Sequence, residues 1–230
     1  MLKDSKLLIK ELRKYSEGEI SELMSISPKL AALNVERYAS FKTPFTTKNA
    51  KPCLTAFKGD VYTDIEVEDY SKAEFNFAQK RLRILSGLYG VLRPLDLIQA
   101  YRLEMKTKLG STRGDSLYEF WGNRISQQLN EALSETKSKT VVNLASNEYF
   151  KAVKANALDG EVFTPIFKEQ KAAQLKVIAI YAKRARGMMA NYIIRNKIKK
   201  VDELKKFSAA GYRFNASESS ENDFVFSRKL

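Results

Sequence analysis

The feature that most constrains the fold is a set of short strand-like runs separated by helical segments. The runs at 141–145 and 162–167 are uncharged and bounded by polar residues, which is typical of buried strands. A further strand is predicted at 176–181, and a basic helix over 182–200. Because strands that alternate with helices form sheets with helices packed on them, we expect an α+β or mixed α/β fold: a mixed sheet flanked by helices.

The N-terminal forty residues predict three helices. The first is expected to end at Gly18, and the second carries Ile20, Leu23 and Met24 on one face and is expected to end near 25–27. Pro28 suits the first turn of a third helix, where its missing N–H group is not needed. The spacing in this helix predicts three side chains that face a core: Leu30, Leu33 and Tyr38.

The middle of the chain predicts a short strand and a long helix. The strand is expected at 53–57, after a loop with two prolines. Ser71 and Glu74 have the spacing of a capping box, which predicts a helix from there to about 86–87. A turn-rich connection is expected at 87–94.

The second half adds one more helix and a hairpin. Asp115 or Ser116 is expected to cap a helix that continues through Ala132. The tail predicts a hairpin of strands at 212–214 and 224–226.

The length and the even composition predict a single domain. A chain of 230 residues with 44% apolar and 29% charged residues is ample for a buried core. No internal repeat, low-complexity tract or long linker marks a boundary. We therefore expect one domain over 1–230, with a helix-hairpin-helix-like subregion at about 19–40.

The sequence predicts a cytoplasmic protein without a membrane partner. Its first ten residues hold no continuous apolar stretch, so they do not predict a signal peptide. No apolar run approaches the roughly 18–20 residues that span a bilayer. The lone cysteine, Cys53, suits a reducing compartment.

The absence of histidine excludes several kinds of active site. Without imidazole there is no Ser-His-Asp or Cys-His pair, and the usual zinc, copper or iron sites lack their ligands. No Walker loop or Rossmann glycine pattern occurs, so we expect no cofactor and no metal. Cys53 lies in an apolar run and is expected to be buried and inert.

The formal net charge of +13 indicates a polyanionic partner, most often a nucleic acid. From 170 to 201 the chain has no acidic residue but many cations, including Lys183, Arg184 and Arg186. These three stand at the opening of the predicted helix, where cations oppose the helix dipole, which hints at a bound anion. A solvated charged helix face is the alternative.

The two short helices near the N-terminus are a second candidate for phosphate binding. A tight turn between helices can offer backbone N–H groups of the second helix to a DNA phosphate. Here the turn contains Ser27, Pro28 and Lys29 in place of the usual glycines, so a plain αα-hairpin is the alternative.

Charged residues in the central segment are a third candidate. Lys58, Arg93 and Arg102 have the chemistry to bind phosphate, if they line a cleft. Asp60, Glu104 and Tyr62 are then the candidate catalytic residues, should the protein be an enzyme. The alternative is local ion pairing, as between Arg93 and Asp96 or between Arg102 and Glu104.

The same segments resemble the YaaA family of peroxide stress response proteins. The matching motifs are AFKGDVY at 56–62, LRILSGLYGVLRPLD at 82–96, YRLEM at 101–105, FWG at 120–122, VNLAS at 142–146 and YAKRARG at 181–187. The resemblance covers nearly the whole chain, and motifs of this length are specific.

The resemblance implies a cytosolic protein that helps cells to survive hydrogen peroxide by holding down unincorporated intracellular iron. It also implies a mixed α/β fold with DNA binding, a helix-hairpin-helix at 20–38 and a positively charged cleft. The cleft would draw on Lys58, Arg93, Arg102, Lys183, Arg184 and Arg186. Members usually open with a short apolar strand and Ser-Pro-Ala-Lys, which have no counterpart in this sequence, so we expect an unpaired sheet edge.

Two hypotheses follow. The leading one is a non-enzymatic stress protein that binds DNA, expected to be double-stranded, through its phosphates and largely without sequence specificity. The second is an enzyme that acts on a phosphate-bearing or nucleotide substrate in the basic cleft. The sequence leaves the oligomeric state open.

Overall fold

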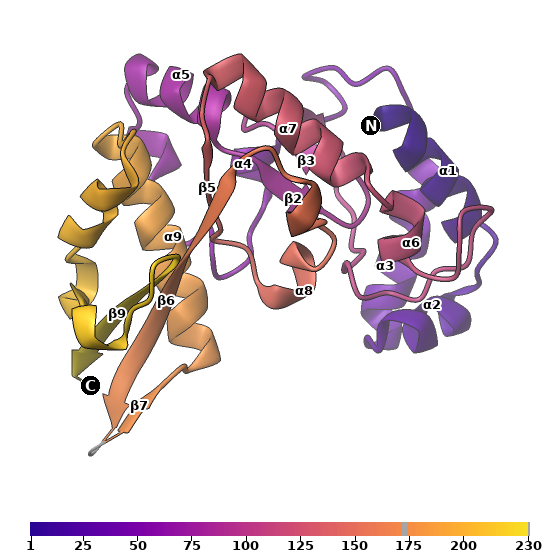
Figure 1. Cartoon of the computed structure of the whole chain (residues 1–230). Coiled ribbons are helices and arrows are strands. Elements are labelled where there is room, and N and C mark those ends of the chain that lie inside the picture. Colours follow the sequence, from indigo (N-terminus) through magenta and orange to yellow (C-terminus); the bar gives the residue numbers. More distant parts are fainter. Residues whose placement is uncertain (172–173, 230) are drawn as a thin grey trace. The chain divides into compact units, whose positions relative to one another are not determined.

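The computed structural model describes residues 1–171 and 174–229. The chain gathers into two compact units, each built from several segments (Figure 1). Unit 1 consists of 1–56, 83–129 and 147–157, and unit 2 of 57–82, 130–146 and 158–230. The predicted mixed α/β class is confirmed, whereas the single domain stays a prediction. The described residues include no helix long and apolar enough to cross a membrane.

Unit 1 begins with α1 (Leu2–Leu12), α2 (Glu17–Met24) and α3 (Pro28–Ser40). The first helix ends before Gly18, contrary to the prediction, because Ser16 starts α2 with a capping box that also uses Glu19. Pro28 occupies the first turn of α3, as predicted.

The core face of α3 differs from the prediction in two of three residues. Tyr38 is buried, but Leu30 and Leu33 are about two-fifths exposed, at 40% and 38%. The residues of α3 that face the core are Ala31, Asn34 and Tyr38. The core-facing stripe thus starts one residue after Leu30, and periodicity alone does not distinguish the two choices.

The rest of unit 1 contains two small antiparallel sheets. β1 (Lys51–Pro52) pairs with β4 (Leu97–Ile98), and β2 (Ile84–Ser86) pairs with β3 (Gly90–Leu92). The predicted strand at 53–57 is wrong: Cys53–Ala56 form the helical turn α4. Within the segment at 87–94, residues 87–89 form the turn of the β2–β3 hairpin and residues 90–92 are β3 itself.

The predicted helix from Ser116 is confirmed at its start and interrupted in the middle. Ser116 caps α6 (Leu117–Trp121), and Gly122 then adopts a φ of +50°, which separates α6 from α7 (Arg124–Thr136). The indole N–H of the fully buried Trp121 donates to the Gly87 carbonyl at 3.0 Å. Residues 124–129 of α7 belong to unit 1 and its remaining residues to unit 2, while the short helix α8 (Asn147–Phe150) belongs to unit 1.

Unit 2 is built on a mixed sheet in the order β5-β6-β9-β8. Here β6 runs parallel to β5 and β9, while β8 is antiparallel to β9. A further strand, β7, pairs antiparallel with the end of β6. The bounds are β5 Thr140–Val142, β6 Glu161–Lys171, β7 Gln174–Lys176, β8 Arg213–Phe214 and β9 Asp223–Lys229. The tail hairpin is therefore confirmed.

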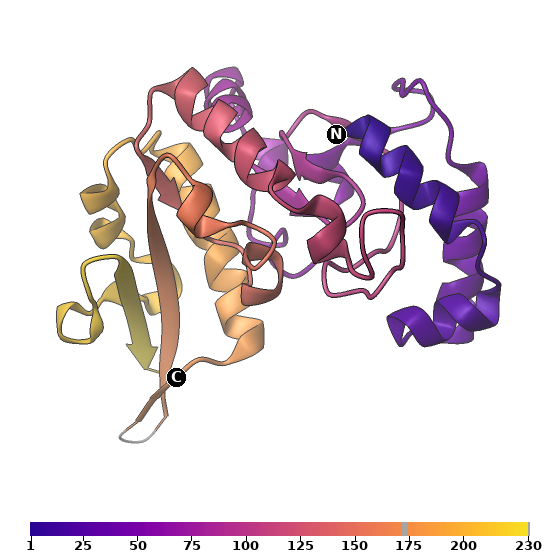
Figure 2. The same cartoon turned by 45° about the vertical axis from the view of Figure 1, so that its right-hand side comes forward.

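Unit 2 also contains α5 (Lys72–Arg81) and α9 (Ala179–Arg195), which contact each other. α5 begins with the predicted capping box of Ser71 but ends at Arg81, because 84–86 pair as a strand. α9 lies along β6 (Figures 1 and 2). The predicted strand at 176–181 is therefore wrong except at Lys176, the last residue of β7, because α9 already begins at Ala179.

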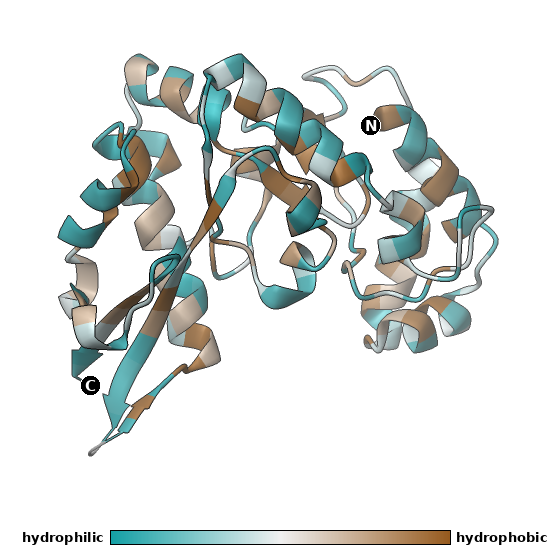
Figure 3. Ribbon diagram, in the orientation of Figure 1, coloured by the Kyte–Doolittle hydropathy of each residue, from teal (hydrophilic) through white to brown (hydrophobic). Residues whose placement is uncertain are grey.

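The core of unit 2 lies between α9 and the sheet. Ala185 and Met189 of α9 belong to the same buried cluster as Phe167 and Phe226 of the strands. β6 is hydrophobic in its middle and hydrophilic at its carboxyl end (Figure 3). This aromatic-rich cluster fixes α9, and with it the basic stretch that the sequence singled out.

Candidate functional site

The predicted site residues divide between the two units. Unit 1 holds five of them: Ser27, Lys29, Arg93, Arg102 and Glu104. Unit 2 holds six: Lys58, Asp60, Tyr62, Lys183, Arg184 and Arg186. A single cleft lined by both sets stays a prediction, and each set is described within its own unit.

A pocket of about 370 Å³ lies in unit 1 beside the turn between α2 and α3. Leu23, Met24 and Ser25 line one part of it. The remaining lining residues come from the segment at 102–108: Arg102, Glu104, Lys106, Thr107 and Lys108. The pocket thus joins two of the three candidates from the sequence, the helical hairpin and the central segment.

Burial alternates along the segment at 102–109. The buried residues are Leu103, Met105, Thr107 and Leu109, whereas Arg102, Glu104, Lys106 and Lys108 are exposed or half-buried. The chain turns within this segment, since the Thr107 N–H donates to the Glu104 carbonyl, and all four charged residues line the pocket. We call them the charged row. Lys106 and Lys108 were missed from the sequence, although the alternating pattern of apolar and charged residues could have indicated them.

Glu104 stands between two cations of the charged row. Arg102 donates to its carboxylate at 2.7 Å, and the Lys106 ammonium lies 3.2 Å from it. The hydrogen bond to Glu104 holds the pKa of Lys106 above its ordinary value. The predicted alternative of an Arg102–Glu104 ion pair is therefore correct. The charged row still has three cations for one carboxylate.

Contacts from three directions hold the charged row in place. The Tyr38 hydroxyl of α3 donates to the carbonyl of Arg102. The backbone N–H of Lys106 donates to the Glu148 carboxylate of α8 at 3.2 Å. A side chain at Gly87 would come within 2.2 Å of the Leu103 carbonyl, so the backbones touch there. Rigid support of this kind keeps a binding site in one geometry.

The hairpin residues have defined structural roles. The Ser27 hydroxyl accepts the backbone N–H of Leu30 at 3.4 Å and so caps α3. Ser25, in the turn, adopts a left-handed φ of +52°. Lys29 is exposed in the first turn of α3.

Arg93 lies at a turn of unit 1. Its backbone N–H donates to the Asp96 carboxylate at 2.8 Å. Its carbonyl accepts from the Cys53 thiol at 3.0 Å. Cys53 is fully buried, and burial raises the pKa of its thiol to about 12. A peroxide-reactive cysteine needs thiolate character, which this environment suppresses, so the expectation of a buried Cys53 is confirmed.

The cations at the start of α9 face carboxylates of their own unit. The Arg184 guanidinium makes two hydrogen bonds to Asp64, at 2.9 and 2.8 Å, which raise the pKa of Arg184. The Lys183 ammonium lies 3.6 Å from the carboxylate of Asp60. These acids account for cations that oppose the helix dipole, so the dipole argument does not by itself require an external anion.

Arg186 differs from its neighbours. It is half-buried, and its guanidinium makes no hydrogen bond or ion pair with any residue in 1–171 or 174–229. Burial lowers the pKa of Arg186. A half-buried cation without an anion is unfavourable on its own, which makes Arg186 the strongest anion-binding candidate on α9.

The remaining candidates of unit 2 lie before α5. Lys58 is exposed, and the Tyr62 ring stacks on Phe57 with 5.1 Å between centroids. Tyr62 and Asp60 belong to unit 2 and Glu104 to unit 1, so the three candidate catalytic residues are not brought together within one unit. The described part of the chain holds no group of three or more Cys, Asp or Glu residues arranged to bind a metal.

Comparison with known proteins identifies the family. The family model of the peroxide stress protein YaaA matches residues 1–218. The chain belongs to this family. The resemblance read from the sequence motifs is therefore confirmed, and membership supports a role in the peroxide stress response.

Relatives match along almost the entire chain. A UPF0246 protein of Colwellia psychrerythraea is 52% identical over 229 residues, which cover 100% of this chain and 89% of the relative. One of Cellvibrio japonicus is 53% identical over 222 residues, with 96% and 86% covered. One of Saccharophagus degradans is 52% identical over 229 residues, with 100% and 90% covered.

Proposed function

We propose that this protein binds double-stranded DNA through phosphate contacts, largely without sequence specificity, as part of the peroxide stress response. The observation that carries the proposal is the charged row at the pocket beside the α2–α3 turn. Three cations converge there from a segment of seven residues, Arg102 to Lys108. Lysine and arginine contacts to phosphate fix a protein on DNA but read no sequence.

The pocket offers lysine side chains to a phosphate. The exposed ammonium groups of Lys106 and Lys108 supply positive charge there. The wall of the pocket is itself supported by the Tyr38 hydroxyl of α3, which ties the hairpin to the charged row.

Arg186 supports the proposal independently in unit 2. A phosphate oxygen at its guanidinium would supply the hydrogen bonds that the described residues do not. Lys58, Lys183 and Lys29 are exposed and would add further contacts on the surface of each unit.

We propose that the protein limits damage by unincorporated iron because it protects DNA, not because it chelates the iron. Without histidine, and with Cys53 buried, the usual soft and imidazole ligands for iron are missing from the sequence. A protein that covers the phosphate backbone limits the access of iron to it, because the phosphates are where cations gather on DNA. We also propose that the protein acts in the cytoplasm.

Binding of two unrelated 20-base-pair duplexes at several salt concentrations tests the proposal, with fluorescence anisotropy as the readout. We expect similar affinities for both duplexes and a steep fall with salt. The double variant Lys106→Ala/Lys108→Ala should lower the salt slope by up to about 1.8, since each lost phosphate contact removes about 0.9. The control Lys6→Ala/Lys10→Ala removes the same charge from exposed positions of α1. No binding at low salt, or equal loss in both double variants, would contradict the proposal.

The pocket also favours a second candidate, an enzyme that acts on a phosphate-bearing or nucleotide substrate. Its volume of about 370 Å³ is within the usual range for small ligands, and Glu104 is a carboxylate with cations on both sides. Glu104→Gln separates the two candidates. Phosphate-backbone binding should strengthen or stay the same, because a negative charge is removed, whereas acid–base catalysis by Glu104 would be lost.

A further inference from the structure

One stripe of α9 binds an acidic segment of the same unit along its whole length. Arg184, Asn191 and Arg195 are separated by seven and four residues, so they lie on the same face of the helix. The stripe extends about 16 Å, since eleven residues rise by about 1.5 Å each. The partner, which we call the acidic segment, covers 60–74 and includes Asp60, Asp64, Glu66, Glu68, Asp69 and Glu74.

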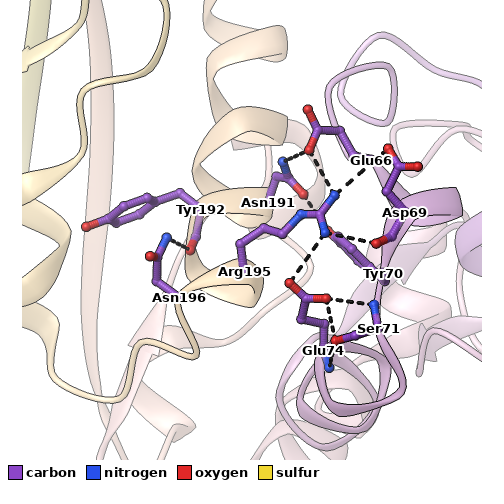
Figure 4. A network of polar contacts seen from close by, with 9 residues as sticks. All are labelled: Glu66, Asp69, Tyr70, Ser71, Glu74, Asn191, Tyr192, Arg195 and Asn196. Carbon is purple, nitrogen blue, oxygen red and sulfur yellow. Dashed lines mark hydrogen bonds and ion pairs between the residues drawn. The ribbon is translucent and has the colours of Figure 1, made fainter.

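The contact involves the most partners at the C-terminal end of the stripe (Figure 4). The Arg195 guanidinium lies 3.1 Å from the Glu66 carboxylate and 3.4 Å from that of Glu74. It also stacks over the Tyr70 ring at 5.1 Å. Asn191 donates to Glu66 at 3.1 Å and accepts from the Tyr70 hydroxyl at 2.8 Å. This end fastens the acidic segment to α9.

The cations become more exposed toward the N-terminal end. The side chain of Arg195 is 29% exposed and that of Arg184 48%, although Asp64, which Arg184 binds through two hydrogen bonds, is only 13% exposed. In the last pair both partners are about half exposed, at 55% for Lys183 and 48% for Asp60, and the charged atoms are 3.6 Å apart. Solvent reaches both cations, so an anion from solution can compete with these carboxylates, most easily at Lys183.

The backbones, in contrast, cannot separate without loss of packing. At Gly187, between Arg184 and Asn191, a Cβ atom would come within 2.1 Å of the Val61 carbonyl oxygen. The acidic segment therefore stays on α9 while the side chains of Lys183 and Arg184 change partners. Arg186 lies next to them in the same turns of the helix.

We propose that Asp60 and Asp64 compete with DNA phosphates for Lys183 and Arg184, and so set the affinity of this surface for DNA. The proposal rests on the proposed function. A phosphate offers the guanidinium two oxygens in the same geometry as a carboxylate. A phosphate can therefore replace Asp64 as the partner of Arg184, and only the side chain of Arg184 has to move. Arg186, which has no carboxylate partner among the described residues, needs no such exchange.

If these carboxylates compete with DNA phosphates, removing the charge of one of them should strengthen DNA binding. Asp64→Asn keeps the size of the side chain and releases Arg184. We expect duplex affinity to rise about two- to fivefold, the upper part of the range that exposed ion pairs give, because the Arg184–Asp64 pair has two hydrogen bonds. Asp60→Asn should act in the same direction by a smaller factor, because its ion pair is longer and more exposed.

The control is Asp202→Asn, which changes the net charge by the same amount. Asp202 pairs with Lys205 at 2.7 Å and lies beyond the C-terminal end of α9 in unit 2. At 0.1–0.15 M salt the screening length is roughly 8–10 Å, so this charge should have little effect on the N-terminal end of α9. Melting temperatures of all variants show that each one is folded.

Asp64→Asn in an Arg184→Ala background completes the test. The gain should vanish there, because the cation that Asp64 holds is absent. The inference is overturned if Asp64→Asn leaves duplex affinity unchanged, if Asp202→Asn raises the affinity equally, or if the gain persists without Arg184. The proposed function still holds in these cases, provided that the wild type binds duplex DNA and that binding depends on Lys106 and Lys108. If no variant and no wild-type protein binds duplex DNA, both proposals fail.

Discussion

Gly187 is the position where one added methyl group should have the largest effect on unit 2. A Cβ atom there would lie 2.1 Å from the Val61 carbonyl oxygen, although such contacts are essentially never shorter than 3.0 Å. The carbonyl belongs to the backbone, so α9 and the acidic segment would have to move apart by roughly 0.9 Å. Overpacking of this kind typically costs about 1–3 kcal/mol.

The expected sign is opposite to that of an ordinary helix position. Because the clash is with a backbone atom, we expect the overpacking cost in the upper part of that range, about 2–3 kcal/mol. Gly→Ala inside a helix stabilises by up to about 1 kcal/mol, so the net effect of Gly187→Ala should be a loss of about 1–2 kcal/mol. Gly18→Ala in α2 is the matched control, because no atom lies within 4 Å of its added Cβ. It should increase the free energy of unfolding.

Urea unfolding of the two variants and the wild type measures both effects. The m-value shows whether the surface exposed on unfolding is unchanged. If Gly187→Ala proves as stable as the wild type, α9 is not in close contact with Val61. The argument that the acidic segment stays on α9 would then lose its basis.

Three further predictions follow from burial. Burial raises the pKa of the Cys53 thiol and of the Tyr149 phenol to about 12, and moves that of Tyr38 and Tyr89 upward. As pH rises, the unfolded chain loses these protons before the folded protein does. The free energy of unfolding should therefore stay constant below about pH 9 and fall as pH rises toward 12. Urea titrations at pH 8 and pH 10.5 measure this difference. Cys53 should react with iodoacetamide at pH 8 far more slowly in the folded protein than in urea, since a shift of the pKa from 9.0 to about 12 leaves about a thousandfold less thiolate. Trp121, the single tryptophan, reports on unit 1, so its fluorescence transition should coincide with that of far-UV circular dichroism if the chain is one cooperative domain, and separate transitions would refute that prediction.

Local signals in the sequence predicted the starts of helices well. Ser71 with Glu74 starts α5, Ser116 starts α6 and Pro28 starts α3, because each cap or proline acts on N–H groups within three or four residues. The ends of helices were less predictable. The helix expected to reach 86–87 stops at Arg81, since Ile84–Ser86 form a hairpin with Gly90–Leu92.

The helical turn at Cys53 shows why nearby residues alone misled the prediction. An apolar run of five residues fits a strand and a helix equally. The choice is made by distant partners: the backbone N–H of Cys53 donates to the Asp96 carbonyl, and that of Leu54 to the Pro94 carbonyl. These carbonyls lie about forty residues after Cys53 in the sequence, and periodicity, which describes neighbouring residues only, does not predict such contacts.

Formal charge in the sequence is a poor guide to the charge that a ligand meets. The acid-free stretch at 170–201 predicted the most basic surface, yet Lys183, Arg184 and Arg195 face carboxylates that are more than 100 residues away in the sequence. Conversely, the charged row includes Glu104 and therefore looks mixed in sequence, although its three cations line one pocket. Phosphate binding should therefore depend more on Lys106 and Lys108 than on Arg184, and only the loss of Asp64 should raise the contribution of Arg184.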